Sequence, residues 1–119
     1  MNYYSNSNKL IEKMNKNGGN ACDVLTAENG CVAGCKAGFT FYRETEYKKP
    51  GVHNDQEGFL VLEGHGKAKF GDEEFDVYPG LAMIAPAGTP HAIKKDEDSC
   101  DVKVFWFHCA VLMIYKRLR

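Results

Sequence analysis

The chain has 119 residues, 44% of them hydrophobic and 26% charged, a size and composition that fit one globular domain with its own core. The formal net charge is −1, and the basic residues are scattered apart from a short run at 116–119. These features exclude a basic face for a nucleic-acid backbone, and no apolar run approaches the roughly 20 residues that a membrane-spanning helix needs. We therefore expect a protein that binds neither nucleic acid nor a membrane.

The cellular compartment is inferred from the opening residues and from the cysteines. Residues 1–10 lack the apolar segment of a secretory signal peptide. The five cysteines are an odd number at spacings that match no zinc motif: Cys22, Cys31, Cys35, Cys100 and Cys109. Reduced thiols in the cytoplasm are the favoured interpretation, and a redox or metal role for the Cys31 and Cys35 pair is the alternative.

The first predicted element is a short helix over residues 8–16. Leu10, Ile11 and Met14 recur there at helical spacing, and Gly18-Gly19 follows as a stop signal. Residues 1–20 are therefore predicted to form a helical extension outside the main domain.

From residue 21 onward the pattern changes to short runs of Val, Phe, Tyr and Ile. Turn signals such as "KKPG", "EGHG", "YPG" and "PAGTP" interrupt these runs. A turn every 8 to 12 residues or so is typical of an all-β sandwich or barrel, which we predict for residues 21–115. The predicted strands are 21–26, 37–45, 57–63, 66–70, 73–78, 81–85, 90–95 and 101–114.

Two of these strands carry apolar side chains on both faces. Along 57–63 the residues Phe59 and Val61 alternate with two leucines, and the last strand alternates in the same way. The apolar groups expected to point outward are Leu60, Leu62, Phe105 and Phe107. A second copy of the chain would cover them, so we expect a homodimer.

Two spacings in the middle of the chain resemble the two sequence motifs of the cupin superfamily. The first motif, G-x5-H-x-H-x3,4-E-x6-G, is matched by His53, Glu57 and Gly64. The second, G-x5-P-x-G-x2-H-x3-N, is matched by Gly80, Pro86, Gly88 and His91. The resemblance covers residues 37 to 109 and implies a small single-domain cupin, a double-stranded β-helix or jelly-roll barrel.

The resemblance also implies a metal inside the barrel. Carried over by position, the ligands are His53, Glu57 and His91, while Gly51 occupies the place of the first histidine of the motif. Thr45 and Lys95 replace the opening Gly and the closing Asn of the two motifs. Two imidazoles and one carboxylate suit a divalent ion such as Fe, Mn, Ni or Zn.

Two other residues, Asp55 and His108, are alternative ligands. A shifted alignment makes His53 the first ligand and Asp55 the second. His108 could supply a fourth nitrogen if its strand face lines the barrel, but a core histidine with a hydrogen-bond partner is the favoured interpretation. His65, between two glycines, is predicted to be exposed, and Glu63 is interpreted as a surface turn residue. Arg43 is interpreted as a solvated edge charge.

Two functions remain open at this point. One is a metal-dependent enzyme of the dioxygenase, isomerase or lyase type that acts on a small polar molecule. The other is a non-catalytic protein that binds or senses a sugar or carboxylate without a metal. Both predict a small-molecule ligand inside the barrel.

Overall fold

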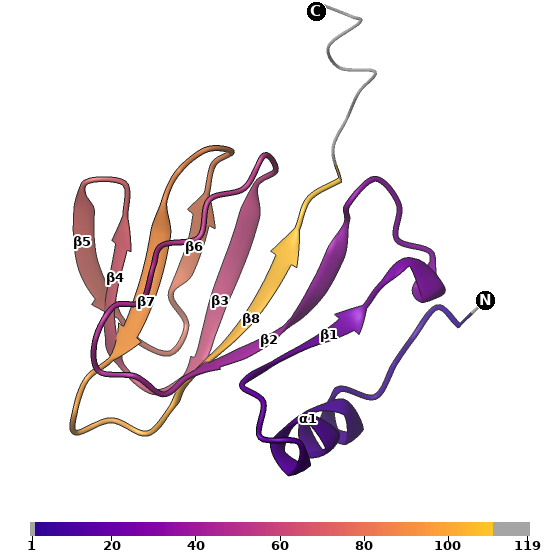
Figure 1. Ribbon diagram of the computed structural model, residues 1–119, viewed down its shortest axis with the longest axis horizontal. Coiled ribbons are helices and arrows are strands. Elements are labelled where there is room, and N and C mark those ends of the chain that lie inside the picture. Colours follow the sequence, from indigo (N-terminus) through magenta and orange to yellow (C-terminus); the bar gives the residue numbers. More distant parts are fainter. Residues whose placement is uncertain (1, 111–119) are drawn as a thin grey trace, which may run out of the picture.

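The computed structural model describes residues 2–110. Its elements, in chain order, are α1 (Ser7–Lys16), β1 (Ala21–Leu25), the 3₁₀ turn η1 (Ala27–Asn29), β2 (Lys36–Tyr42), β3 (Glu57–Glu63), β4 (Gly66–Phe70), β5 (Glu73–Val77), β6 (Ala82–Ala85), β7 (His91–Lys95) and β8 (Val102–His108). The strands form two antiparallel sheets, of order β1-β2-β8-β3-β6 and β5-β4-β7 (Figure 1). The predicted all-β jelly-roll fold with one short helix is confirmed.

Helix α1 lies outside the two sheets, beside β1 (Figure 1). The side chain of Asn6 caps its first turn by accepting a hydrogen bond from the backbone N–H of Lys9. Met14 is buried, as the helical spacing of apolar residues predicts. No helix within residues 2–110 has the length and apolar character to span a bilayer.

Every predicted strand is present, most of them with ends within one residue of the prediction, and two end clearly earlier. The strand predicted over 37–45 ends at Tyr42, and the strand predicted over 101–114 ends at His108. Residues 111–115, the end of the predicted domain, lie outside the described residues. The sequence "ENG" belongs to a short 3₁₀ turn that Thr26 caps and Gly30 ends at φ 104°.

The core lies between the two sheets and is built from alternating strand residues. It comprises Phe59, Val61, Ala68, Val77, Ala85, Ile93, Val102, Val104 and Trp106. Leu60, Leu62 and Phe107 point away from it and are 40%, 38% and 42% exposed. The predicted alternation in β3 and β8 is therefore confirmed, and these three outward residues are not covered by the rest of the described chain. Phe105, also predicted to point outward, is half-buried and packs edge-on against Phe39.

The segment between β2 and β3, residues 43–56, runs along β7 and links the two sheets. Gly51 and His91 exchange two backbone hydrogen bonds of 2.9 and 3.0 Å, and Lys95 N–H donates to the carbonyl of Glu44 at 3.0 Å. Tyr47 donates its hydroxyl to Glu74 on β5 at 2.8 Å. These contacts hold the segment, and with it His53, close to the first residues of β3 and β7.

Candidate metal centre

Strand ends bring the candidate ligands together. Glu57 is the first residue of β3, His91 is the first of β7, and His108 is the last of β8. Glu57 and His108 are directly paired across the antiparallel β3 and β8 strands, so their side chains project from the same face. His53 comes from the segment that precedes β3. All four side chains therefore meet at one end of the barrel.

Two of the predicted ligands, His53 and His91, lie close to the carboxylate of the third, Glu57. Glu57 Oε1 lies 3.3 Å from His53 Nε2 and 3.2 Å from His91 Nε2. Glu57 is only 8% exposed. A buried carboxylate is costly without a compensating positive charge or hydrogen bonds, so this end of the barrel requires a cation or protonated imidazoles.

The tautomer of His91 makes this requirement more specific. Its Nδ1 lies 3.0 Å from the carbonyl oxygen of Thr89, which can only accept a hydrogen bond, so Nδ1 carries the proton. In the neutral ring the Nε2 lone pair then faces the carboxylate of Glu57. The contact with Glu57 is the main reason why the pKa of His91 is raised; burial opposes the shift, and the bond to Thr89 adds to it. A proton on Nε2 thus stabilises the site when no metal is present.

The donor set fits a divalent metal. A histidine that ligates a metal through one nitrogen almost always donates its other N–H to a carbonyl or carboxylate, as His91 does to Thr89. Ligand atoms around an ion with bonds of about 2.0–2.2 Å lie about 3.0–3.6 Å from one another. The two distances from Glu57 Oε1 to His53 and His91 fall in this range. Among the described residues, however, His91 is not part of the group whose ligand atoms all lie within 4.8 Å of one another.

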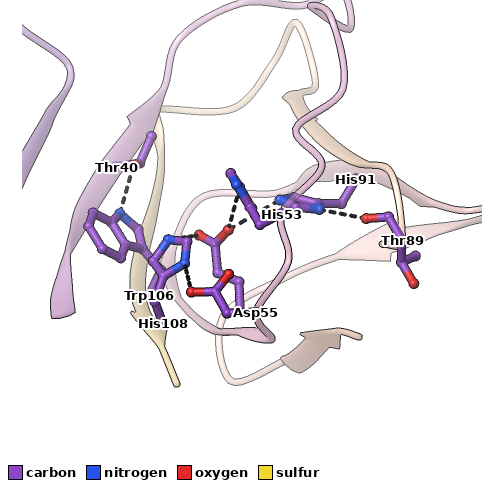
Figure 2. Close-up of polar contacts among 8 residues, drawn as sticks. Thr40, His53, Asp55, Thr89, His91, Trp106 and His108 are labelled. Carbon is purple, nitrogen blue, oxygen red and sulfur yellow. Dashed lines mark hydrogen bonds and ion pairs between the residues drawn. The ribbon is translucent and has the colours of Figure 1, made fainter. Parts of the chain in front are cut away.

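His108 also reaches the site. Its Nε2 lies 3.6 Å from Glu57 Oε2, and ligand atoms of His53, Glu57 and His108 all lie within 4.8 Å of one another. Figure 2 shows the His108 and His91 rings on opposite sides of His53, with ring centroids 5.1 and 5.2 Å from that of His53. The expected hydrogen-bond partner of His108 exists as well, because Asp55 Oδ2 lies 3.0 Å from its Nδ1.

His65 has no part in this site. It is exposed, as predicted, and its Nδ1 lies 2.7 Å from Asp96 Oδ2. Together with Asp98 these residues form a second, solvent-exposed group of potential ligands. Glu63 is exposed too, in agreement with its interpretation as a surface residue.

A cavity of about 270 Å³ adjoins the site. Its lining includes Gly51, His53, Glu57 and His91, together with Tyr42 from β2 and charged residues of the segment 43–56. Burial, and secondarily the charge of Glu57, raise the pKa of Tyr42 far above its ordinary value. The hydroxyl of Tyr42 therefore stays protonated and is available as a hydrogen-bond donor to a ligand.

Arg43 is exposed, in agreement with its interpretation as a solvated charge, but its guanidinium also has partners in the chain. Its guanidinium donates to Asp101 Oδ2 at 3.0 Å, to the carbonyl of Gly19 at 2.9 Å and to Asn15 Oδ1 at 3.2 Å. These bonds tie the end of α1 to the sheet. Arg43 lines the cavity but its donors are engaged in holding the helix.

Comparison with known proteins agrees with this architecture. Residues 39–108, more than half of the chain, match the cupin domain family. The chain belongs to this cupin family. No curated protein matches the cupin by sequence.

Solved structures similar to this cupin share little sequence identity with it. The cupin domain of Schizosaccharomyces pombe Cnp3 superposes with a TM-score of 0.68 at 16% identity, over 82% of this chain and 64% of that one. A cupin 2 conserved barrel domain protein from Rhodopseudomonas palustris has a TM-score of 0.62 at 20% identity, with 76% and 60% covered. HppE, solved with Fe(II) and its substrate, has a TM-score of 0.65 at 17% identity, with 75% and 52% covered. At these identities the likeness shows the fold, and this cupin spans less than two thirds of each of these chains.

Proposed function

We propose that this cupin binds a divalent metal through His53, Glu57 and His91 and holds a small polar molecule in the adjoining cavity. The observation that carries the proposal is the convergence of two imidazole nitrogens, at 3.2 and 3.3 Å, on one oxygen of a buried carboxylate. The tautomer of His91 supports the proposal. Nδ1 donates its proton to Thr89, so the lone pair of Nε2 points at the carboxylate of Glu57. An ion beside Glu57 Oε1 would neutralise the buried carboxylate and accept the lone pair of His91.

The cavity supports a ligand beside the metal. A bound Fe, Mn, Ni or Zn ion supplies Lewis acidity toward an oxygen of the small molecule. The chain's own residues would orient that molecule: the protonated hydroxyl of Tyr42 can donate a hydrogen bond, and Lys49, which also lines the cavity, can attract a carboxylate or another anionic group. Glu57 and the histidines are reserved for the metal.

This arrangement favours a metal-dependent enzyme of the dioxygenase, isomerase or lyase type. The cavity reaches His53, Glu57 and His91 directly, so a ligand in it contacts the ion. The Fe(II) and substrate in the HppE structure support iron as the first metal to test. The alternative is a protein that binds a sugar or carboxylate without a metal. In that case a chelator should not affect ligand binding.

Metal titration of two variants tests the proposal. We expect His91→Ala to lose metal binding and to remain folded, because its backbone hydrogen bonds with Gly51 do not need the side chain. His65→Ala removes an exposed imidazole of the second group of potential ligands and is expected to keep the ion at the site of Glu57 and His91. Full metal uptake by His91→Ala would exclude His91 as a ligand.

A further inference from the structure

The first histidine of the cupin metal motif is missing in this chain, and its position lies next to the metal ligands. Gly51 stands there, and a Cβ built on it would lie 3.1 Å from His91 Nε2 and 3.4 Å from His53 Nε2. Position 51 is therefore close to both imidazoles, as expected for the first ligand of the motif. Gly51 has no side-chain atom that could bind a metal, and it lines the cavity.

His108 enters the same site from β8. It is 9% exposed and directly paired with Glu57 across the β3 and β8 strands. Its Nε2 lies 3.6 Å from Glu57 Oε2, the carboxylate oxygen that His53 and His91 do not approach most closely. The residues that line the cavity include Gly51, His53, Glu57 and His91 but not His108. His108 thus approaches from the side of the site that faces away from the cavity.

Asp55 fixes the tautomer of His108, so that the nitrogen facing Glu57 carries a lone pair. Asp55 Oδ2 lies 3.0 Å from His108 Nδ1, and a carboxylate only accepts hydrogen bonds, so Nδ1 carries the proton. Nε2 of the neutral ring then opposes Oε2 of Glu57 at 3.6 Å, too far for a hydrogen bond. Two groups that both offer lone pairs are stable side by side when a cation lies between them.

His108 and His91 therefore share one arrangement. In each ring Nδ1 donates to a fixed acceptor, Asp55 Oδ2 or the carbonyl of Thr89, and Nε2 points at Glu57. This is the usual arrangement of metal-ligating histidines, in which a carboxylate or carbonyl fixes the tautomer and the ring orientation. The ring of Trp106, 5.5 Å from His108 and nearly perpendicular to it, further restricts its rotation.

We propose that His108 replaces the missing first-motif histidine as a metal ligand and that Asp55 is its positioning residue. This inference rests on the proposed metal binding. The fourth ligand comes from β8, on the side of the site that faces away from the cavity. The side occupied by Gly51 is left open toward the cavity.

The four histidines of the chain allow a direct test by NMR. One equivalent of Zn(II) is added to metal-free protein labelled with ¹⁵N in histidine, and the two imidazole nitrogens of each ring are followed. We expect the Nε2 signals of three rings to shift on zinc binding while those of His65 stay unchanged. His108→Gln, which should lack one of the three shifted signals, assigns it, and His65→Gln is the matched control.

Zinc affinity gives the second readout. His108→Gln is expected to weaken zinc binding by at least about 10-fold, since even residues that only orient a ligand contribute about 10- to 100-fold. Asp55→Ala is expected to weaken it by about 10-fold, and Asp55→Asn to recover part of the loss because the amide oxygen still accepts from Nδ1. A purely structural role of Asp55 would leave affinity unchanged in folded protein.

The outcomes separate the two proposals. If only the His53 and His91 signals shift and His108→Gln binds zinc like the wild type, His108 is not a ligand, while metal binding by this cupin stands. If no imidazole signal shifts in the wild type, the metal-binding proposal fails and this inference fails with it. The wild-type spectrum decides between three shifted rings and two even if His108→Gln does not fold.

Discussion

The buried carboxylate of Glu57 binds the proton of His91, and at the proposed metal site this proton competes with the ion. The contact between them raises the pKa of His91 above its ordinary value of 6.5, so the metal-free folded protein binds a proton here more tightly than the unfolded chain does. The resulting stabilisation is fully present below the unfolded pKa and is lost as the pH rises through the raised folded pKa. A metal must displace this proton, so its affinity has the opposite pH dependence.

Stability and zinc affinity should therefore change in opposite directions with pH. The free energy of unfolding of metal-free protein should fall as the pH rises from about 6.5. Zinc affinity should rise over the same interval. Urea unfolding and zinc titration measure the two, and His91→Gln should flatten both. Metal-free stability that rises across this interval and depends on His91 would contradict the assigned proton.

At the scale of strands, Gly66 is a point where no side chain fits. A Cβ at this residue of β4 would lie 2.0 Å from the backbone carbonyl oxygen of Lys94 on β7, and only separation of the two strands could relieve the overlap. We expect Gly66→Ala to lower the free energy of unfolding by more than about 2 kcal/mol.

Gly19→Ala is the matched control for this prediction. A Cβ at Gly19 would meet the side chain of Met14 at 3.1 Å, and that flexible side chain can move. Chemical unfolding of both variants measures the difference. Equal stability of the two variants would mean that β4 and β7 are not packed as closely as described.

The strands were predictable from the sequence because most of them alternate against a single core. Phe59 and Val61 in β3 and Val104 in β8 follow this rule, and all are buried. The role of Arg43 was not predictable, since its partners Asn15 and Asp101 are distant in sequence and meet only after α1 docks.

The candidate site was predictable only in part. Motif spacing identified His53, Glu57 and His91, which the structure brings together. The sequence favours a core histidine over a ligand at His108, because the pairing of Glu57 with His108 is a property of the strand order. Alternation along β8 was the signal that placed it on the inner face.

At the scale of the whole molecule, the outer face of the five-stranded sheet lacks a partner within the described chain. Ile84 and Phe107 are both directly paired with Gly58, on β6 and β8, and are 47% and 42% exposed. The Phe107 ring lies against Gly58, where an added Cβ would be 2.2 Å from it. Leu60 and Leu62 extend this apolar surface along β3.

We expect a second copy of the chain to cover this face, because a two-fold axis buries the same apolar patch on both subunits. Sedimentation at tens of micromolar protein should show a dimer. Phe107→Glu should give a monomer, while Tyr78→Glu, at an exposed turn residue outside this face, should not. A monomeric wild type would rule out the homodimer.

The central claim, that this barrel holds a divalent metal, is tested most directly by the metal content of the protein purified without a metal-affinity column. Metal-free protein is then supplied in turn with Fe(II), Mn(II), Ni(II) and Zn(II), and the bound metal is measured after desalting. We predict close to one ion per chain in the wild type and loss of the ion in Glu57→Gln, which removes the charge but keeps the shape of the side chain. A folded wild type that retains none of the four ions would contradict the account.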